Sequence, residues 1–465
     1  MPLPMAARAR LTYRPLGRAD TLARFHRALR GATPFLLESS LRDAELGRYS
    51  FLGSDPVGWF RSRGDRHAHA TPGDEERGCG HPLDALRAFL ARLPSASAGR
   101  PPLPFVGGLV GTFAYDLGRR IERIPDTKGV DLGVPDIHLA WYPRVTVIDH
   151  AWGEAYELRL RDAPEEAPPH VPDDLAVPPA GDAVRPLDRA SYTETIEEAK
   201  TAIAEGEIFQ VNLSQRHALP LSGTPAQGYE RLRARTPATF AAYVDAGDHV
   251  LLSSSPERFL CTRGRDVETR PIKGTRPRGS TRADDRALSA ELLESAKDAA
   301  ENVMIVDLER NDLGKVSEFG SVHVPVLQAL RSLPTVHHLE SVVRARLRAN
   351  VDLIDLLRAT FPGGSITGAP KPRAMEIIER LEPHRRGAYT GAIGYVSLNG
   401  NVDLNIAIRT ATVLGGTAHF AVGGGIVADS DPRAEYRETL DKLRGHAEAL
   451  TGGRVEVLED GLRVA

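Results

Sequence analysis

Apolar residues after position 190 recur at the spacing of an amphipathic helix. Tyr192, Ile196, Ala199 and Ile203 fall on one helical face, while Ser191 is suited to cap the start and Gly206 to end the helix. The pattern therefore predicts a helix over residues 191–206. Comparable patterns predict helices near 286–310, 351–359 and 371–381.

The hydrophobic period then changes from helical to alternating. Over residues 208–214 the apolar strand face consists of Phe209, Val211 and Leu213, and the polar face consists of Gln210, Asn212 and Ser214. A polar strand face is either solvated or part of a site, and the pattern leaves both open. Further strands are expected at 249–254, 265–272, 391–398, 402–413 and 417–422. Because strands and helices come in runs, the pattern favours an α+β fold with antiparallel sheet over a doubly wound dinucleotide fold.

One segment breaks these patterns. Residues 162–186 are rich in Pro, Ala and Asp and offer few positions for a core, which predicts a linker or a long surface loop. It separates an N-terminal region, 1–161, which contains β-like runs such as 141–149, from a second region, 187–455. The polar stretch 67–80 is also expected to be a loop.

Composition narrows the classes of function. The 465 residues carry 59 basic and 62 acidic side chains, so no overall field favours nucleic acid or an anionic membrane. The two cysteines, Cys79 and Cys261, are too few for a disulfide framework, which fits a reducing compartment. No stretch reaches the roughly 18 consecutive apolar residues of a membrane span. We expect a cytoplasmic protein with neither nucleic-acid nor membrane partners.

The strongest local motif is a run of three glycines, 423–425, followed by Asp431 and Pro432. Glycines after a strand allow backbone amides to approach a ligand closely, and Asp-Pro is typical of a cap and first turn of a helix. The motif predicts a ligand-binding turn that leads into a helix.

Two acidic pairs are candidate metal ligands. Glu435, Glu438 and Lys442 share a face of the predicted last helix, and two carboxylates one turn apart suit Mg²⁺. The alternative is an exposed acidic turn with a Glu438–Lys442 ion pair. Asp298 and Glu301 form a second pair, and metal binding becomes attractive only if the two pairs meet in space.

The segment 361–371 superficially resembles a phosphate-binding loop. Lys371 does not directly follow the second glycine of such a loop, as its lysine must, so a nucleotide-binding P-loop is rejected. A turn that feeds a helix near Pro370 can hold a carboxylate on free N–H groups, or it is simply a tight structural turn.

Four single residues have both a chemical and a structural interpretation. Arg409 could bind a carboxylate through its fork or reach solvent. Glu257 follows a strand end, where a general acid or an ordinary turn residue could stand. Lys273 next to Gly-Thr is usually a solvated lysine, and His338 is more often hydrogen-bonded than catalytic.

Taken together, these segments resemble the chorismate-utilising enzymes: anthranilate synthase component I, aminodeoxychorismate synthase component I, isochorismate synthase and salicylate synthase. The resemblance runs from about residue 190 to 450, and more weakly over 36–40 and 47–53. It implies an α+β fold in which two large antiparallel sheets pack face to face as a sandwich, with helices on the outside.

The resemblance also implies roles for the candidate residues. Glu301 and Glu438 would bind Mg²⁺, with Asp298 and Glu435 beside them. Glu257 would protonate the departing 4-hydroxyl of chorismate. The residues implied to hold the substrate carboxylates are Arg409, Tyr389, Gly424, Gly425 and Lys442. Those implied to line the pocket are His338, Ser365 and Thr275.

Two positions choose among the members. Isochorismate and salicylate synthases have a lysine base at the position of Gln210, and glutamine is too weak a base to activate water. Anthranilate synthases have alanine at the position of Lys273, whereas aminodeoxychorismate synthases have a lysine that is proposed to attack C2 of chorismate. The chain therefore resembles component I of aminodeoxychorismate synthase, and Lys273 is the implied nucleophile.

This resemblance also implies a partner. The chain shows no nucleophile-elbow cysteine of a glutaminase, so ammonia would come from solution or from a separate glutamine amidotransferase subunit in a heterodimer. The product would serve 4-aminobenzoate and folate synthesis.

Two alternatives stay open. One is anthranilate synthase component I, which also eliminates pyruvate. The other is an inactive regulatory subunit that binds tryptophan, because Leu37, Glu38 and Ser39 resemble the inhibitor site of anthranilate synthases.

Overall fold

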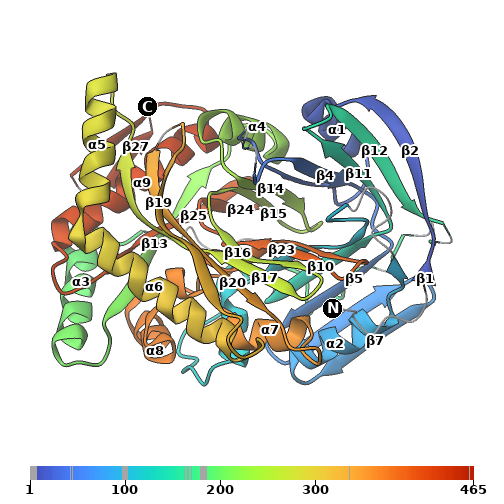
Figure 1. The fold of residues 1–465 in the computed structure, drawn as a ribbon, viewed down its shortest axis with the longest axis horizontal. Coiled ribbons are helices and arrows are strands. Elements are labelled where there is room, and N and C mark those ends of the chain that lie inside the picture. The colour runs from blue at the N-terminus through green and yellow to red at the C-terminus, as the bar shows by residue number, and fades with distance from the viewer. Residues whose placement is uncertain are drawn as a thin grey trace.

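The computed structural model describes residues 8–464 except 42, 44, 97–102, 162, 165, 166, 169, 178–185, 335 and 460. Two large antiparallel sheets dominate it (Figure 1). The 12-stranded sheet contains, in spatial order, β18 (Ile272–Pro277), β20 (Val336–Arg346), β17 (Asp266–Arg270), β16 (Arg258–Arg263), β23 (Val402–Asn405), β22 (Ala392–Ser397), β9 (Gly108–Phe113), β10 (Ile137–Tyr142), β5 (Gly58–Arg63), β6 (Arg66–Thr71) and β7 (Asp74–Cys79), with β19 (His323–Ser332) paired to β20.

The 11-stranded sheet contains β2 (Leu11–Arg18), β12 (Glu154–Leu160), β11 (Arg144–Asp149), β4 (Tyr49–Gly53), β3 (Phe35–Glu38), β14 (Phe240–Asp245), β15 (Val250–Ser255), β24 (Thr410–Leu414), β25 (Thr417–Ile426), β13 (Gln210–Pro220) and β21 (Gly368–Ala369). Two short pairs complete the strands: β1 (Arg8–Ala9) with β8 (Ser95–Ala96), and β26 (Val455–Leu458) with β27 (Gly461–Val464).

The two large sheets pack face to face through aromatic side chains. The Phe35 ring of β3 lies 4.6 Å from the Tyr142 ring of β10, and the Phe51 ring of β4 lies 5.5 Å from the Tyr395 ring of β22. In both contacts one ring belongs to each sheet. Such pairs stabilise the interface beyond the burial of their apolar area. The predicted α+β sandwich is therefore confirmed.

Helices cover the outside of the sandwich (Figure 1). They are α1 (Thr21–Ala28), α2 (Pro82–Arg92), α3 (Arg189–Ala204), α4 (Pro225–Arg235), α5 (Arg282–Glu294), α6 (Ala296–Gly314), α7 (Leu353–Thr360), α8 (Lys371–Leu381) and α9 (Pro432–Thr451), with 3₁₀ turns η1 (Tyr115–Arg120) and η2 (Gly364–Ile366). On α9 the predicted apolar stripe is buried, including Tyr436, Leu440 and Leu443. Asp431 caps this helix through Ala434 N, and Pro432 occupies its first turn, as predicted.

At three of the points where the chain passes from one sheet to the other, the local pattern does not reveal the crossover. β10 and β11 are joined at Pro143, β15 and β16 at residues 256–257, and β23 and β24 at residues 406–409. The strand expected over 402–413 is therefore two strands in different sheets, and the run 141–149 is also divided. A strand that is buried on both faces has apolar residues on both faces in either sheet, so the pattern cannot mark a crossover.

Other predicted boundaries also need correction. The helix expected at 286–310 is two helices, because Ser295 is extended and caps α6 through Asp298 N. The strand expected at 265–272 is divided into β17 and β18 at Pro271, which has no N–H for a ladder. Asp188, and not Ser191, caps α3. The stretch 67–80, expected to be a loop, forms most of the β6–β7 hairpin at the edge of the 12-stranded sheet.

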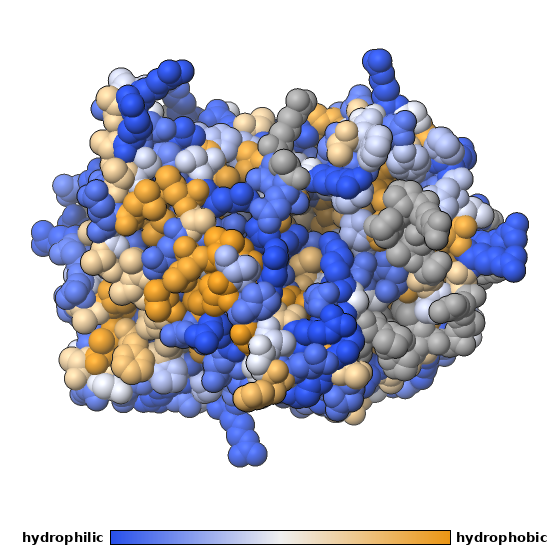
Figure 2. Space-filling model, viewed as in Figure 1, coloured by the Kyte–Doolittle hydropathy of each residue, from blue (hydrophilic) through white to orange (hydrophobic). Residues whose placement is uncertain are grey.

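Two large apolar side chains, those of Phe209 and Val303, are exposed. Phe209, just before β13 begins, is 71% exposed, and Val303 on α6 is 40% exposed. Val303 belongs to an apolar surface that also includes Leu293 of α5 and Val326 and Leu327 of β19. Figure 2 shows apolar side chains gathered over this part of the molecule.

Part of the expected linker packs against the 12-stranded sheet. Leu175 is buried with Trp59, Ala68 and Ala70, and Val177 N donates to Asp248 Oδ2 at 2.8 Å. Residues 162, 165, 166, 169 and 178–185 of this segment lie outside the described residues. Both large sheets combine strands from 1–161 with strands from 187–455. Among the described residues, no helix is long and apolar enough to cross a membrane.

Candidate active site

A cavity of about 220 Å³ lies where the two sheets, two helices and two of the crossovers meet. β18 and β20 of one sheet, β25 of the other, and helices α6 and α9 contribute to its wall. The predicted site residues that line it are Glu257, Lys273, Thr275, Asp298, Glu301, His338, Ser365, Tyr389, Arg409, Gly424, Gly425, Glu435, Glu438 and Lys442. The fold thus brings together residues that are up to 185 positions apart in sequence, from Glu257 to Lys442.

Glu257 and Arg409 are positioned by two crossovers that run beside each other. Ile406 N donates to the Glu257 carbonyl at 3.0 Å, and Ser254 N donates to the Arg409 carbonyl at 3.0 Å. Arg409 has a φ of 53°, a conformation that non-glycine residues seldom adopt. These bonds fix both side chains at the boundary between the sheets.

The Glu257 carboxyl is suited to general acid chemistry. Its burial raises the pKa to about 7, although the nearby Ser365 hydroxyl and Lys273 ammonium act in the opposite direction. Ile272 N also donates to Oε1 at 3.4 Å. A carboxyl with a pKa near neutrality can hold a proton and release it to a leaving group.

Lys273 lies on β18 opposite the glycine run of β25. Burial lowers the pKa of its ammonium, an effect that Lys442 strengthens and the carboxylates of Glu301 and Glu257 oppose. A Cβ at Gly425 would stand 3.4 Å from Lys273 Nζ and would overlap the Gln210 carboxamide. Glycine at 425 therefore makes room for both side chains.

The polar face of β13 is buried, so the solvated interpretation of this face is wrong. Gln210 is 1% exposed, Asn212 9% and Ser214 6%. The short strand β21 pairs with Gln210 and Val211 at the edge of the sheet, and Asn212 N donates to the Thr367 carbonyl at 2.8 Å. Gln210 stands behind the cavity wall with its amide against Gly425.

The three glycines lie within β25 and not after it, which corrects the predicted turn. Gly423, Gly424 and Gly425 pair with Ser214, Leu213 and Asn212 of β13. A side chain at Gly423 would overlap the Leu213 carbonyl, and one at Gly424 would stand 3.1 Å from Glu435 Oε2. The glycines therefore permit close packing beneath the acidic residues of α9.

The two acidic pairs meet at this cavity, which satisfies the condition set for metal binding. Burial raises the pKa of Glu301 and of Glu435, and neighbouring carboxylates add to both effects. The cavity therefore disfavours the ionised form of both carboxyls, a form that a bound cation would favour. Lys297 stands 4.0 Å from Glu435 Oε1.

The other two carboxylates have cationic partners. Glu438 Oε1 lies 2.6 Å from Lys442 Nζ, and this ion pair lowers the Glu438 pKa. Asp298 Oδ2 accepts from Arg276 Nη2 at 3.0 Å. Within the described part of the chain, no group of three or more His, Cys, Asp or Glu side chains is arranged to hold a metal ion. A hard cation can nevertheless be held by one or two protein carboxylates, with water and substrate as its other ligands. Glu301 together with the acidic residues of α9 fits such a site.

Cationic and neutral donors face these carboxylates across the cavity. Arg409 Nη1 donates to the Lys442 carbonyl at 2.9 Å, and Lys442 Nζ donates to the Gly423 carbonyl at 2.9 Å. Burial and the nearby Arg409 charge lower the His338 pKa to about 4, so the ring is neutral at pH 7. Its Nδ1 lies 2.8 Å from the Thr275 hydroxyl.

Three polar side chains of the cavity lining were missed by sequence reasoning: Asn212, Arg276 and Lys297. Asn212 shared a strand face with Gln210, a signal that could have identified it. Lys297 directly precedes Asp298, but its approach to Glu435 depends on how α6 and α9 pack. Arg276 pairs with Asp298 across 22 positions, and no local pattern marks that pair.

The glycine-rich segment before α8 contains a buried ion pair and contributes to the cavity wall. Lys371 is 5% exposed, and its Nζ lies 2.5 Å from Asp312 Oδ2 and 2.9 Å from the Thr360 carbonyl. The rejection of a P-loop is consistent with this buried ion pair. Ser365 and Ile366 of the same segment line the cavity.

The family model for chorismate binding enzymes matches residues 40–448. The chain belongs to the chorismate binding enzyme family.

Known proteins of this family align with most of the chain. Aminodeoxychorismate synthase component 1 of Salmonella typhimurium is 42% identical over 85% of this chain and 88% of that protein. Anthranilate synthase component 1 of Streptomyces coelicolor is 40% identical over 88% of this chain and 82% of that protein. The crystal structure of anthranilate synthase component I from Streptococcus pneumoniae has a TM-score of 0.74 and 31% identity, and the match covers 88% of this chain and 94% of that chain.

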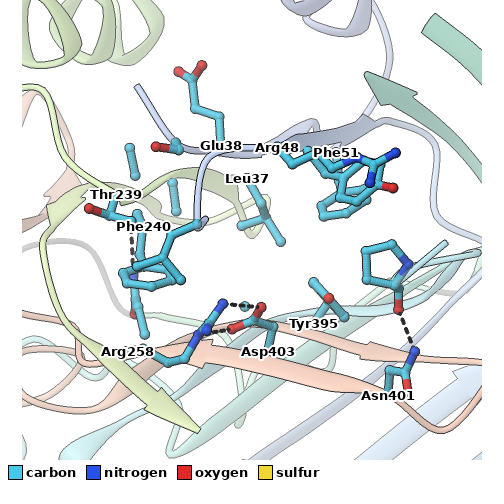
Figure 3. A pocket seen from close by; sticks show the side chains of 18 of the residues that line it. Leu37, Glu38, Arg48, Phe51, Thr239, Phe240, Arg258, Tyr395, Asn401 and Asp403 are labelled. Carbon is cyan, nitrogen blue, oxygen red and sulfur yellow. Dashed lines mark hydrogen bonds and ion pairs between the residues drawn. The ribbon is translucent and has the colours of Figure 1, made fainter. Parts of the chain in front are cut away.

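Leu37, Glu38 and Ser39 lie away from the active-site cavity of this family member. They line a second cavity of about 540 Å³ between the sheets (Figure 3). Leu37 points into the hollow, whereas Glu38 is directed away from it. Arg233 Nε donates to Glu38 Oε1 at 2.6 Å and the Tyr229 hydroxyl donates to the same oxygen at 2.9 Å. The Glu38 carboxylate is therefore already paired, and tryptophan binding at this cavity stays a prediction.

Proposed function

We propose that this chain is component I of an aminodeoxychorismate synthase, which converts chorismate and ammonia into 4-amino-4-deoxychorismate and water. The observation that carries the proposal is the presence of Lys273 and Glu257 in one cavity, the first with a lowered pKa and the second with a pKa raised to about 7. The Salmonella typhimurium relative that is 42% identical is an aminodeoxychorismate synthase component 1, which supports the assignment.

The cavity offers binding groups for both carboxylates of chorismate. Arg409 and Lys442 supply positive charge on one side, and Tyr389 lies beside Arg409. A buried carboxylate is stable only where cations or hydrogen-bond donors replace its water. We assign the substrate carboxylates to these side chains and to the backbone of Gly424 and Gly425.

In the proposed covalent step, neutral Lys273 Nζ attacks C2 of chorismate and forms a C–N bond. The ring electrons shift, the bond from C4 to its hydroxyl breaks, and Glu257 donates the proton that lets the hydroxyl leave as water. Ammonia then adds at C4 as the C2–N bond breaks, which restores Lys273. Burial favours the neutral amine that this attack needs.

Mg²⁺ is the proposed cofactor, held by Glu301 and Glu438 with Glu435 and Asp298 beside them. Burial disfavours the ionised forms of Glu301 and Glu435, and a cation held between them would offset that cost, which supports a cation at this place. When bound, Mg²⁺ would neutralise a substrate carboxylate and anchor it by Lewis acid contact. The ion pairs of Glu438 with Lys442 and of Asp298 with Arg276 would have to loosen as it binds.

The proposed ammonia source is a separate glutamine amidotransferase subunit in a heterodimer, and the proposed location is the cytoplasm. Both described cysteines are poor candidates for a glutaminase nucleophile. Cys261 is buried and its thiol pKa is raised to about 12, while Cys79 is exposed on the β7 hairpin strand. Glutamine-driven turnover by the isolated chain would contradict this part of the proposal.

Product analysis tests the reaction directly. The purified chain is incubated with chorismate, Mg²⁺ and ammonium, and the products are separated before and after an aminodeoxychorismate lyase is added. We expect 4-amino-4-deoxychorismate first and 4-aminobenzoate only after the lyase. Direct formation of fluorescent anthranilate would instead support the second candidate, anthranilate synthase component I. The observation that favours this candidate is the 40% identical relative from Streptomyces coelicolor.

A second experiment tests the covalent step. Without ammonium, chorismate and Mg²⁺ should leave an adduct of chorismate minus water on Lys273, detectable by mass spectrometry of the digested chain. An intact, unmodified Lys273 peptide after chorismate has been consumed would reject this role.

A further inference from the structure

Arg386 stands behind the cavity wall and uses every one of its N–H groups. The guanidinium is 6% exposed. It makes the following bonds: Nε to Glu382 Oε2 at 3.0 Å, Nη2 to Glu382 Oε1 at 2.7 Å, Nη2 to the Asn212 carbonyl at 2.6 Å, Nη1 to the Ile366 carbonyl at 2.9 Å and Nη1 to Thr390 Oγ1 at 3.3 Å. An arginine has five N–H donors, so its capacity is fully used.

Arg386 contacts three separate parts of the cavity wall. Asn212 belongs to β13, Ile366 to the turn η2, and Tyr389 to the segment before β22, and all three line the cavity. Arg386 bonds the backbone of the first two and lies 5.9 Å from the centre of the Tyr389 ring. One side chain thus connects segments that are otherwise far apart in sequence.

The bond to Thr390 fixes a strained part of the backbone next to Tyr389. Thr390 has a φ of 60°, which is an outlier for a β-branched residue. Its hydroxyl also donates to the Tyr389 carbonyl at 2.6 Å. Such a conformation persists only where the surroundings impose it, and it sets the direction in which Tyr389 enters the cavity.

Glu382 keeps the guanidinium in place from the other side. The carboxylate is 3% exposed, and its Oε1 also accepts from Ser214 N at 2.8 Å and from the Ser214 hydroxyl at 2.9 Å. The Tyr115 ring packs against the guanidinium, and its centre lies 4.6 Å from the Arg386 guanidinium carbon. The side chain is therefore held in a single orientation.

We propose that Arg386 is a positioning residue for the substrate, which holds Asn212, Ile366 and Tyr389 in the arrangement that binds chorismate. This inference rests on the proposed function, because it takes chorismate as the ligand of the cavity. A lysine at 386 keeps the positive charge but has three donors on one nitrogen and no plane to stack on Tyr389 and Tyr115.

The test compares Arg386→Lys with the unmodified chain. We expect the Kd for chorismate, measured calorimetrically with Mg²⁺, and the KM for chorismate to rise about tenfold or more, while kcat changes less. A loss of stability alone would not separate KM from kcat in this way. If Arg386→Lys does not fold, Glu382→Gln loosens the same guanidinium with an isosteric side chain and should shift the same two constants in the same direction.

Arg61→Lys is the matched control. Arg61 is 0% exposed, pairs with Asp248 at 2.5 Å and donates to the Ala246 and Leu175 carbonyls, but none of these partners lines the active-site cavity. It should lose stability and keep the wild-type Kd and KM for chorismate.

The outcomes separate the two claims. Wild-type constants in folded Arg386→Lys, or in Glu382→Gln where the lysine variant does not fold, would overturn the positioning role. An equal rise in the Arg61→Lys control would also overturn it. A wild-type chain that binds chorismate but does not aminate it leaves the binding comparison valid and rejects only the proposed reaction. A wild-type chain that does not bind chorismate rejects both.

Discussion

The two cavities of this protein differ in how their charges are balanced. In the second cavity, Arg258 pairs with Asp403 at 3.0 Å and with Glu268 at 2.8 Å, and Glu38 pairs with Arg233. In the active-site cavity, Glu257, Lys273 and Glu301 have pKa values displaced by burial towards their neutral forms. Perturbed groups that share a cavity are typical of sites that perform chemistry, whereas closed ion pairs are typical of structural or binding surfaces.

The largest effect is expected from Lys273→Ala. Loss of the proposed nucleophile should lower kcat/KM for chorismate amination by about 10³-fold or more, because the proposed covalent step needs the Lys273 amine to form the bond to C2. Lys315→Ala is the control, since Lys315 is 54% exposed and pairs with Asp312 outside the cavity lining. Near-normal turnover by Lys273→Ala would show that Lys273 is not the nucleophile. The main chemical difference between the two cavities would then be lost.

Glu257→Gln should have the next largest effect. The amide keeps the size of the carboxyl but cannot donate its proton, so kcat should fall by about 10²- to 10⁴-fold. With a pKa of about 7 in the free chain, Glu257 is protonated below pH 7 and loses its proton above it. The wild-type kcat/KM should therefore decline as pH rises through about 7, and that decline should be absent from the pH profile of Glu257→Gln. If the pH profile of Glu257→Gln keeps this decline, another group is the general acid.

Glu301→Gln tests the proposed metal site. Because one carboxylate ligand is lost, the Mg²⁺ concentration for half-maximal activity should rise by about tenfold or more. Asp307→Asn on the same helix is the control, because its side chain is 60% exposed and pairs with Arg310. Calorimetric titration of Mg²⁺ provides a measurement that does not depend on turnover. Equal Mg²⁺ dependence in the variant and the control would place the ion elsewhere.

The smallest effect on activity is expected in the second cavity. Glu38→Gln weakens the buried contacts with Arg233 and Tyr229, so the free energy of unfolding should fall by about 2 kcal/mol. Since these residues lie outside the active-site cavity, kcat/KM should stay at the wild-type value. Denaturant titration and steady-state kinetics measure the two quantities. A large loss of kcat/KM in a stable variant would show that the two cavities are coupled.

Much of the fold and the site could be predicted because the signals are local. The α9 stripe of Tyr436, Leu440 and Leu443, and the cap at Asp431, follow from helical spacing and capping chemistry. The family motifs also lie within continuous segments. By contrast, the hairpin at 66–79 has few apolar residues to mark its strands, because it forms an edge with exposed positions such as Asp74 and Glu75.

The sequence by itself determined the fold class and the family, and it supplied each polar side chain of the active-site cavity except Asn212, Arg276 and Lys297. Only the tertiary structure decided which of these residues meet and in what electrostatic state. Lys273 resembles a surface lysine in its local sequence, and its lowered pKa arises from burial against segments far away in the chain. Burial and Coulomb interactions depend on distance in space, whereas hydrophobic period and capping depend on distance along the chain. At the sheet crossovers 256–257 and 406–409, the chain brings residues that are far apart in the sequence close together in space.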